Sequence, residues 1–196
     1  MRFVLATANP GKINEMQSIL SGLGAEVVTR NDLGIEIDIE ETGTTFFENA
    51  LIKAKAICAL TGLPSIADDS GLIIDALGGR PGVFTSTFGG ESLSDSERCL
   101  YLLKEMEGME QRSAKFVSTI VCAFPDGSTI SAEGECLGEI MRSPSGSGGF
   151  GYDPVFIAKG NKRTMAQLTD SEKNSISHRG SALRKFSELL HERKYL

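Results

Sequence analysis

The sequence predicts a mixed α/β protein in which helices pack around a central sheet. Short apolar runs typical of strands alternate with stretches in which apolar residues recur at helical spacing. The two kinds of element do not follow a strict strand–helix–strand order, so we expect a mixed sheet. The chain has 196 residues and shows no internal repeat or linker, and we therefore expect a single domain over residues 1–196.

The first elements are a strand, a helix and a second strand. An apolar run over residues 3–6 predicts the first strand. Asn9 can cap the helix that follows, and Pro10 suits its first turn. Gly22 and Gly24 end this helix, and residues 25–29 predict the next strand.

The clearest helix follows a polar, acidic connection over residues 31–43. Thr45 and Glu48 form a capping box at its start, and the apolar residues after them lie along one stripe. Residues 65–67 predict a strand that leads into two aspartates, after which residues 72–77 are apolar again.

The second half begins with a glycine-rich loop over residues 78–90. Ser94 and Glu97 predict a capped helix that ends near residue 107. Residues 114–124 are apolar on both faces, which is typical of a central strand, and residues 129–133 return as its hairpin partner.

The last third contains a second glycine-rich loop, "SPSGSGGFGYDPVF", which enters a strand. Residues 169–174 then predict a short helical turn. Ser177 opens the last helix, whose apolar residues lie on one face.

Composition excludes several classes of protein. The formal net charge of -6 argues against binding to a polymeric nucleic acid, which needs a basic face. We see no signal peptide and no apolar run of the roughly 20 residues that a membrane helix needs. The four cysteines form no CxxC pair, so we expect reduced thiols in a cytoplasmic protein rather than a zinc site.

Asp68 and Asp69 interrupt an apolar stretch, where unpaired carboxylates are costly to bury. The preceding helix is about 24 Å long, and the extended return to Asp69 spans about 23 Å. Asp69 should therefore lie beside Glu41, and a Mg²⁺ ion could offset the charge of the aspartates. Alternatively, Asp68 caps a turn or pairs with a lysine.

Two lysines are candidates for contacts with phosphate. "TANPGK" places Lys12 at the start of a helix, where backbone N–H groups attract anions. A capped helix with a solvated lysine explains the same residues equally well. Lys53 could face a phosphate, although a position facing solvent is more common for lysine.

The segment "GSGGFGYDP" could receive a purine base, because its glycines allow a ligand to approach the backbone. Phe150 and Tyr152 offer flat faces for stacking, and Asp153 can accept a hydrogen bond from a ring N–H. The alternative is a tight turn whose aromatic residues fill the core.

The segment "EKNSISHRG" brings Lys173, His178 and Arg179 together before the last helix. Two basic residues at a helix start are unfavourable for the helix dipole. This suggests that they donate hydrogen bonds to an anion or to a base rich in carbonyl groups.

Taken together, these motifs resemble the inosine triphosphate pyrophosphatase family. The matching blocks occur in the same order and span the chain: "TANPGK", "EETGTTFFENALIKA", "ADDSGLIIDALGG", and "GSGGFGYDPVF" followed by "EKNSISHRG". The resemblance implies an elongated mixed sheet flanked by helices, two lobes around an active-site cleft, and a homodimer. It also implies Mg²⁺-dependent hydrolysis of XTP, ITP and dITP to the monophosphate and pyrophosphate.

The resemblance further implies roles for individual residues. Asp69 is the expected catalytic base and shares the metal with Glu41, and Ser70 touches the substrate. The phosphates are assigned to Thr7, Ala8, Asn9, Pro10, Gly11 and Lys12. The base pocket is assigned to Phe150, Gly151, Tyr152, Asp153, Lys173, His178 and Arg179.

One block departs from the family pattern. Many bacterial relatives read small-Ala-Arg-aromatic where this chain has Thr85, Ser86, Thr87 and Phe88, and Arg80 replaces a residue that is usually small. The departure removes any role that an arginine would play in this loop. It leaves the metal and base motifs intact.

Two other functions fit the same residues. One is a metal-dependent nucleotide phosphatase that releases orthophosphate. The other is a regulator that binds purine nucleotides without catalysis.

Overall fold

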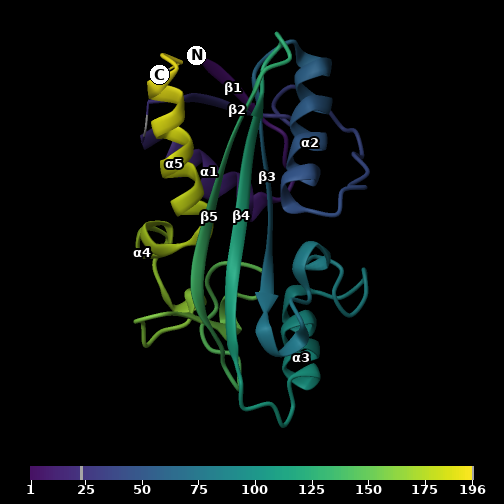
Figure 1. Ribbon diagram of the computed structural model, residues 1–196, viewed down its shortest axis with the longest axis vertical. Coiled ribbons are helices and arrows are strands. Elements are labelled where there is room, and N and C mark those ends of the chain that lie inside the picture. Colours follow the sequence, from purple (N-terminus) through teal and green to yellow (C-terminus); the bar gives the residue numbers. More distant parts are fainter. Residues whose placement is uncertain (23, 196) are drawn as a thin grey trace. The chain divides into compact units, whose positions relative to one another are not determined.

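The structure is a computed structural model that describes residues 1–22 and 24–195 (Figure 1). It contains a six-stranded sheet with the strand order β2-β1-β3-β4-β5-β6. β1 pairs in parallel with β2 and β3, whereas β5 and β6 are antiparallel, so the predicted mixed sheet is confirmed. The strands are β1 (Arg2–Leu5), β2 (Glu26–Thr29), β3 (Ser65–Ile74), β4 (Ser113–Ala123), β5 (Thr129–Ile140) and β6 (Phe156–Ala158).

Capping boxes begin three of the helices, as local sequence favours. Thr45 and Glu48 form the predicted box of α2, and Ser94 and Glu97 form that of α3. The helices are α1 (Pro10–Gly22), α2 (Phe46–Thr61), α3 (Asp95–Glu105), α4 (Asp170–Ile176, with its own box) and α5 (His178–Glu192). Short 3₁₀ helices lie at Asp75–Leu77, Gly82–Phe84, Asp153–Val155 and Met165–Gln167.

The chain folds into two compact units. Unit 1 contains Met1–Asp69, Ser118–Gly134 and the chain from His178 onward, and unit 2 contains Ser70–Val117 and Glu135–Ser177. Unit 2 has one apolar core, to which β3, α3 and β6 contribute Leu72, Leu102 and Phe156.

Unit 1 has an apolar core on each face of its part of the sheet, and α2 and α5 lie on opposite sides of the strands (Figure 1). Ile66 of β3 belongs to the core with residues of α1 and α5, and Ala67 belongs to the core with residues of α2. Successive side chains of a strand point to opposite faces. The same alternation determines where the two aspartates after Ala67 point.

Two strands are longer than the sequence pattern predicts. β3 continues through Asp68 and Asp69, so the predicted interruption between residues 67 and 72 is wrong. β5 continues past Glu133 to Ile140, and buried residues alternate with exposed ones from Ile130 to Leu137. Charged residues on the open face of a half-buried strand conceal this period from a search for apolar runs.

Among the helices within residues 1–22 and 24–195, none has both the length and the apolar character needed to cross a membrane.

Candidate active site

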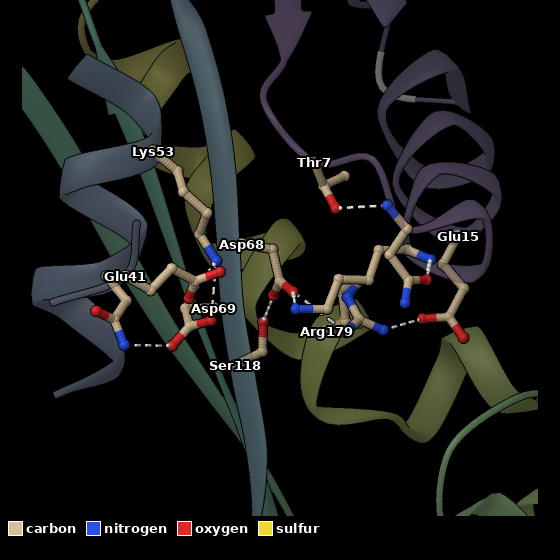
Figure 2. A network of polar contacts seen from close by, with 11 residues as sticks. Thr7, Glu15, Glu41, Lys53, Asp68, Asp69, Ser118 and Arg179 are labelled. Atoms are coloured by element: carbon tan, nitrogen blue, oxygen red, sulfur yellow. Dashed lines mark hydrogen bonds and ion pairs between the residues drawn. The ribbon is translucent and has the colours of Figure 1, made fainter. Parts of the chain in front are cut away.

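The candidate site in unit 1 is built around two adjacent residues of β3 that face opposite sides of the strand (Figure 2). Asp68 contacts residues of α1, β4 and α5, whereas Asp69 contacts α2. Both side chains are buried, with relative exposures of 0% and 7%. The two carboxylates therefore occupy separate environments, although they are neighbours in sequence.

Asp68 lies in a pocket of positive charge. Its Oδ2 is 2.8 Å from Nζ of Lys12 and 3.2 Å from a guanidinium nitrogen of Arg179, and the Ser118 hydroxyl donates to its Oδ1. Burial alone would raise the pKa of Asp68, but Arg179 and Lys12 outweigh burial and hold this pKa well below its usual value. The alternative that Asp68 pairs with a lysine is thus confirmed, and its charge needs no metal to offset it.

Arg179 lies between two carboxylates rather than in open solvent. Its side chain is 1% exposed, and it bonds to Glu15 of α1 as well as to Asp68. Burial lowers the pKa of Arg179, but Asp68 and Glu15 outweigh it and raise this pKa further above its usual value. Sequence reasoning missed Glu15, whose only signal is its position one helical turn after Lys12.

Asp69 lies in a more negative environment. Its Oδ1 accepts a hydrogen bond from Lys53 Nζ at 2.9 Å, and its Oδ2 is 3.5 Å from Nδ2 of Asn49. Burial raises the pKa of Asp69 to about 6, and Glu41 adds to the rise, while Lys53 and Lys12 only partly oppose it.

Lys53 joins the two predicted metal ligands. Its Nζ donates to Glu41 Oε2 at 3.0 Å and to Asp69 Oδ1 at 2.9 Å, so both carboxylates approach one positive group (Figure 2). The lysine is 8% exposed, and the alternative of a side chain facing solvent is therefore wrong. The predicted proximity of Glu41 and Asp69 is confirmed by this shared partner.

The pair formed by Glu41 and Asp69 fits a hard divalent cation. Two carboxylates that converge on an ammonium group offer the oxygen ligands that Mg²⁺ takes in proteins, where water and substrate oxygens complete its shell. In the described part of the chain, no cluster of three or more His, Cys, Asp or Glu side chains is arranged to hold a metal alone. A cation held here would therefore also need ligands from water or substrate.

Asn49 and Gly43 hold the Glu41 segment against α2, and neither was singled out from the sequence. Asn49 Oδ1 accepts a hydrogen bond from the N–H of Gly43 at 2.8 Å. A Cβ atom at residue 43 would lie 2.6 Å from Asn49 Oδ1 and from Glu48 Cβ, so only glycine fits. Asn49 precedes Lys53 by one helical turn, so the two side chains share the face of α2 toward Asp69.

The segment Thr7–Lys12 forms the start of α1 as predicted. Asn9 Oδ1 accepts a hydrogen bond from the N–H of Lys12 at 3.0 Å, and Thr7 Oγ1 accepts one from the N–H of Asn9 at 3.2 Å. Thr7 is buried, whereas Ala8, Asn9 and Pro10 are exposed, and Gly11 is half-buried. The helix dipole favours an anion at this exposed helix start.

Unit 2 brings Phe150, Asp153 and Lys173 together. Asp153 Oδ2 accepts a hydrogen bond from the N–H of Phe150 at 2.9 Å and pairs with Nζ of Lys173. This Nζ lies 4.6 Å from the centre of the Phe150 ring. Gly149 has a φ of 70°, and a Cβ there would collide with the Asp153 carboxylate, so the turn requires glycine.

Tyr152 fills the core of unit 2, as the alternative reading of its segment predicts. It is 2% exposed, and its hydroxyl donates to the carbonyl of Thr85 at 3.1 Å. Phe150, which is half-buried, is the aromatic residue of this segment that keeps exposed surface. Gly151 lies between them, and its N–H donates to Asp95.

The remaining predicted residues are divided between the units. His178 is 5% exposed and begins α5 in unit 1, whereas Lys173 is a buried residue of α4 in unit 2. Ser70, which follows Asp69 in β3, is the first residue of unit 2.

The chain matches the model of the Ham1 family over residues 3–189. A dITP/XTP pyrophosphatase from Bacillus subtilis (strain 168) is 46% identical over 189 residues, which cover 95% of this chain and 96% of that protein. A Ham1 protein from Staphylococcus aureus superposes with a TM-score of 0.88 at 37% identity, covering 98% of this chain and 100% of the other. A HAM1 protein from Coxiella burnetii gives a TM-score of 0.88 at 43% identity, with coverages of 98% and 99%.

These matches confirm the resemblance inferred from the four sequence blocks and the mixed α/β fold class. The family model covers nearly the whole chain, and the relatives match along nearly their whole length. The chain therefore belongs to the Ham1 family.

Proposed function

We propose that this protein hydrolyses the deaminated purine nucleoside triphosphates XTP, ITP and dITP to the monophosphate and pyrophosphate, and so removes them from the nucleotide pool. The proposal follows the dITP/XTP pyrophosphatases to which the chain is similar. The observation that carries it is the buried carboxylate of Asp69, whose pKa of about 6 lies near physiological pH.

Glu41 and Asp69 are the residues that would hold a Mg²⁺ ion. The convergence of their carboxylates on Nζ of Lys53 supports this assignment. When bound, Mg²⁺ supplies positive charge that neutralises the triphosphate.

Asp69 would act on the water that attacks the α-phosphorus. The water oxygen forms a bond to this phosphorus, the bond from the phosphorus to the bridging oxygen breaks, and pyrophosphate leaves with that oxygen. Asp69 orients the water and accepts its proton, a role that suits a carboxylate with a raised pKa. Lys53 keeps the Asp69 carboxylate in place through its hydrogen bond.

The start of α1 would bind the phosphates through the segment Thr7–Lys12. Its support is the exposed first turn of the helix, where the helix dipole favours an anion. Lys12, held by Asp68 at 2.8 Å, adds positive charge at the same helix end.

Purine selectivity is assigned to hydrogen-bond donors. Hypoxanthine and xanthine present a 6-oxo acceptor where adenine presents an amino donor, so donors in the site would be left unpaired by ATP. Ser70 is assigned to the substrate, and the base pocket is assigned to Phe150, Gly151, Asp153 and Lys173 of unit 2. The cluster of Phe150, Asp153 and Lys173 in unit 2 supports part of this set.

Product analysis tests the proposal against both alternatives. The protein is incubated with Mg²⁺ and each common or deaminated nucleoside triphosphate, and pyrophosphate and orthophosphate are measured separately. Pyrophosphate released fastest from XTP, ITP and dITP supports the proposal. Orthophosphate as the product would indicate a phosphatase, and binding without turnover would indicate a regulator.

We also propose a homodimer, which rests on the resemblance, and a cytoplasmic location, which rests on the spacing of the four cysteines. Light scattering of the purified protein measures the mass in solution and tests the dimer. A mass equal to that of one chain, 21.0 kDa, would contradict it.

A further inference from the structure

Thr85 lies in the block that departs from the family pattern, and its hydroxyl joins two segments of unit 2. Thr85 Oγ1 accepts a hydrogen bond from the N–H of Leu72 in β3 at 2.9 Å. The same hydroxyl donates to the carbonyl of Gly82 at 2.6 Å. Leu72 is fully buried, so without this hydroxyl its N–H would lose the partner that the structure gives it.

The carbonyl of Thr85 reaches a third segment, because it accepts the hydrogen bond from the Tyr152 hydroxyl at 3.1 Å. Burial raises the pKa of Tyr152 above its usual value, so the phenol stays protonated and keeps its donor. One residue thus connects β3, three residues after Asp69, to the turn that contains Phe150 and Asp153.

The turn has a second anchor on α3. The N–H of Gly151 donates to Asp95 Oδ2 at 2.7 Å, and the Cys99 thiol donates to the Gly151 carbonyl at 3.3 Å. This anchor holds the main chain of the turn, whereas the carbonyl of Thr85 accepts the hydrogen bond from the Tyr152 hydroxyl. Loss of the Thr85 contact should therefore shift the turn without releasing it from the fold.

We infer that Thr85 is a positioning residue that sets the purine-recognising turn through Tyr152. The inference deepens the proposed function and rests on it for its substrate. Thr85 acts through another residue, since its polar atoms contact Leu72, Gly82 and Tyr152. A small displacement of this turn would weaken its contacts with the purine base, because hydrogen bonds are directional.

Three variants test the inference by steady-state kinetics with ITP and with ATP. Thr85→Val keeps the branched shape but removes the hydroxyl bonds to Leu72 and Gly82 that hold the Thr85 carbonyl in place for Tyr152. Thr85→Ser keeps the hydroxyl, and Thr87→Val is the matched control at an exposed position of the same block. We expect Thr85→Val to lower kcat/KM for ITP about tenfold, mainly through KM, and to narrow the ITP-to-ATP ratio. Thr85→Ser should recover most of the loss, and Thr87→Val should match the wild type.

Tyr152→Phe tests the same contact from the other partner, and so provides a second test if Thr85→Val does not fold. It removes the hydroxyl that contacts Thr85 and leaves the ring, and we expect a smaller narrowing of the ITP-to-ATP ratio than for Thr85→Val. A wild-type KM and ratio in either folded variant would overturn the inference.

Amide hydrogen exchange separates this inference from the proposed function. We expect residues 146–156 to exchange faster in Thr85→Val than in the wild type or in Thr87→Val. Unchanged exchange in Thr85→Val would overturn the positioning role. If the wild type releases no pyrophosphate from ITP, the proposed function fails, and the exchange result still decides whether Thr85 positions the turn.

Discussion

Asp68 and Asp69 are adjacent in β3, yet they form two different regions of unit 1 (Figure 2). On the side of α1 and α5, Asp68 and Glu15 face Lys12 and Arg179, so negative and positive groups balance. On the side of α2, Asp69 and Glu41 share the single cation of Lys53. The first region is neutral as it stands, whereas the second keeps an excess negative charge.

The difference shows that the surroundings of an aspartate, and not its position in the strand, determine how it ionises. Arg179 and Lys12 hold the pKa of Asp68 well below its usual value, so Asp68 keeps its negative charge and pairs with both side chains. The pKa of Asp69 is raised by burial to about 6, so this carboxylate can exchange a proton near neutral pH. Neighbouring acids whose environments separate their pKa values are a recurring arrangement at sites of proton transfer.

The largest expected effect is on catalysis by Asp69→Asn. The amide cannot accept the proton of the attacking water, and we expect kcat for ITP to fall about 10³-fold. Pyrophosphate release measures the rate, and calorimetric titration with ITP should show that binding persists. Asp38→Asn, at an exposed position, is the matched control. Turnover that survives Asp69→Asn would remove Asp69 from its assigned role.

The second largest expected effect is on stability and concerns Asp68, which faces the other side of β3. Asp68→Asn removes the negative charge that Lys12 and Arg179 share, and we expect the free energy of unfolding to fall by about 3 kcal/mol. Urea denaturation followed by circular dichroism measures this change. If the midpoint matches that of the wild type, the ion pairs of Asp68 do not support the fold.

The titration of the two carboxylates provides a third test, with a separation of at least two pH units expected from their pKa shifts. Carbon-13 NMR of the metal-free protein should show Asp69 titrating near pH 6, and Asp68 still ionised below pH 3.8. The stabilising contribution of Asp69 is complete below its unfolded pKa and is lost as pH rises through about 6. That of Asp68 is present above its unfolded pKa and is lost on acidification. Identical titration curves would contradict the distinction.

The smallest of the four effects is on the metal requirement. Glu41→Gln removes one of the two carboxylate groups that converge on Lys53, and we expect the Mg²⁺ concentration for half-maximal rate to rise about tenfold. Glu40→Gln is the control, because Glu40 is an exposed neighbour in the same segment. An unchanged Mg²⁺ requirement would exclude Glu41 as a ligand.

Much of the local structure could be predicted because its determinants are close in sequence. The capping boxes at Thr45 and Ser94 place helix starts within four residues of the signal. The meeting of Glu41 with Asp69 followed from the lengths of one helix and one strand. Each of these inferences uses geometry that a short segment fixes by itself.

The features that the sequence did not reveal depend on distant partners. Asp68 appeared to interrupt a strand because its cation Arg179 lies 111 residues further along the chain. Lys53 was expected to face either a phosphate or solvent, but it is buried against Asp69 and Glu41. Tyr152 looked available for stacking, yet the core of unit 2 encloses it. No local pattern records partners of this kind.

The Gly43–Asn49 junction limits how far the acidic segment before α2 can separate from that helix. The side-chain amide of Asn49 bonds the segment two residues after Glu41 and also reaches toward Asp69. Asn49 therefore contacts both the segment that carries Glu41 and the carboxylate of Asp69. A side chain introduced at Gly43 would collide with Asn49 and Glu48, and would so displace the segment of Glu41 while leaving both acids in the sequence.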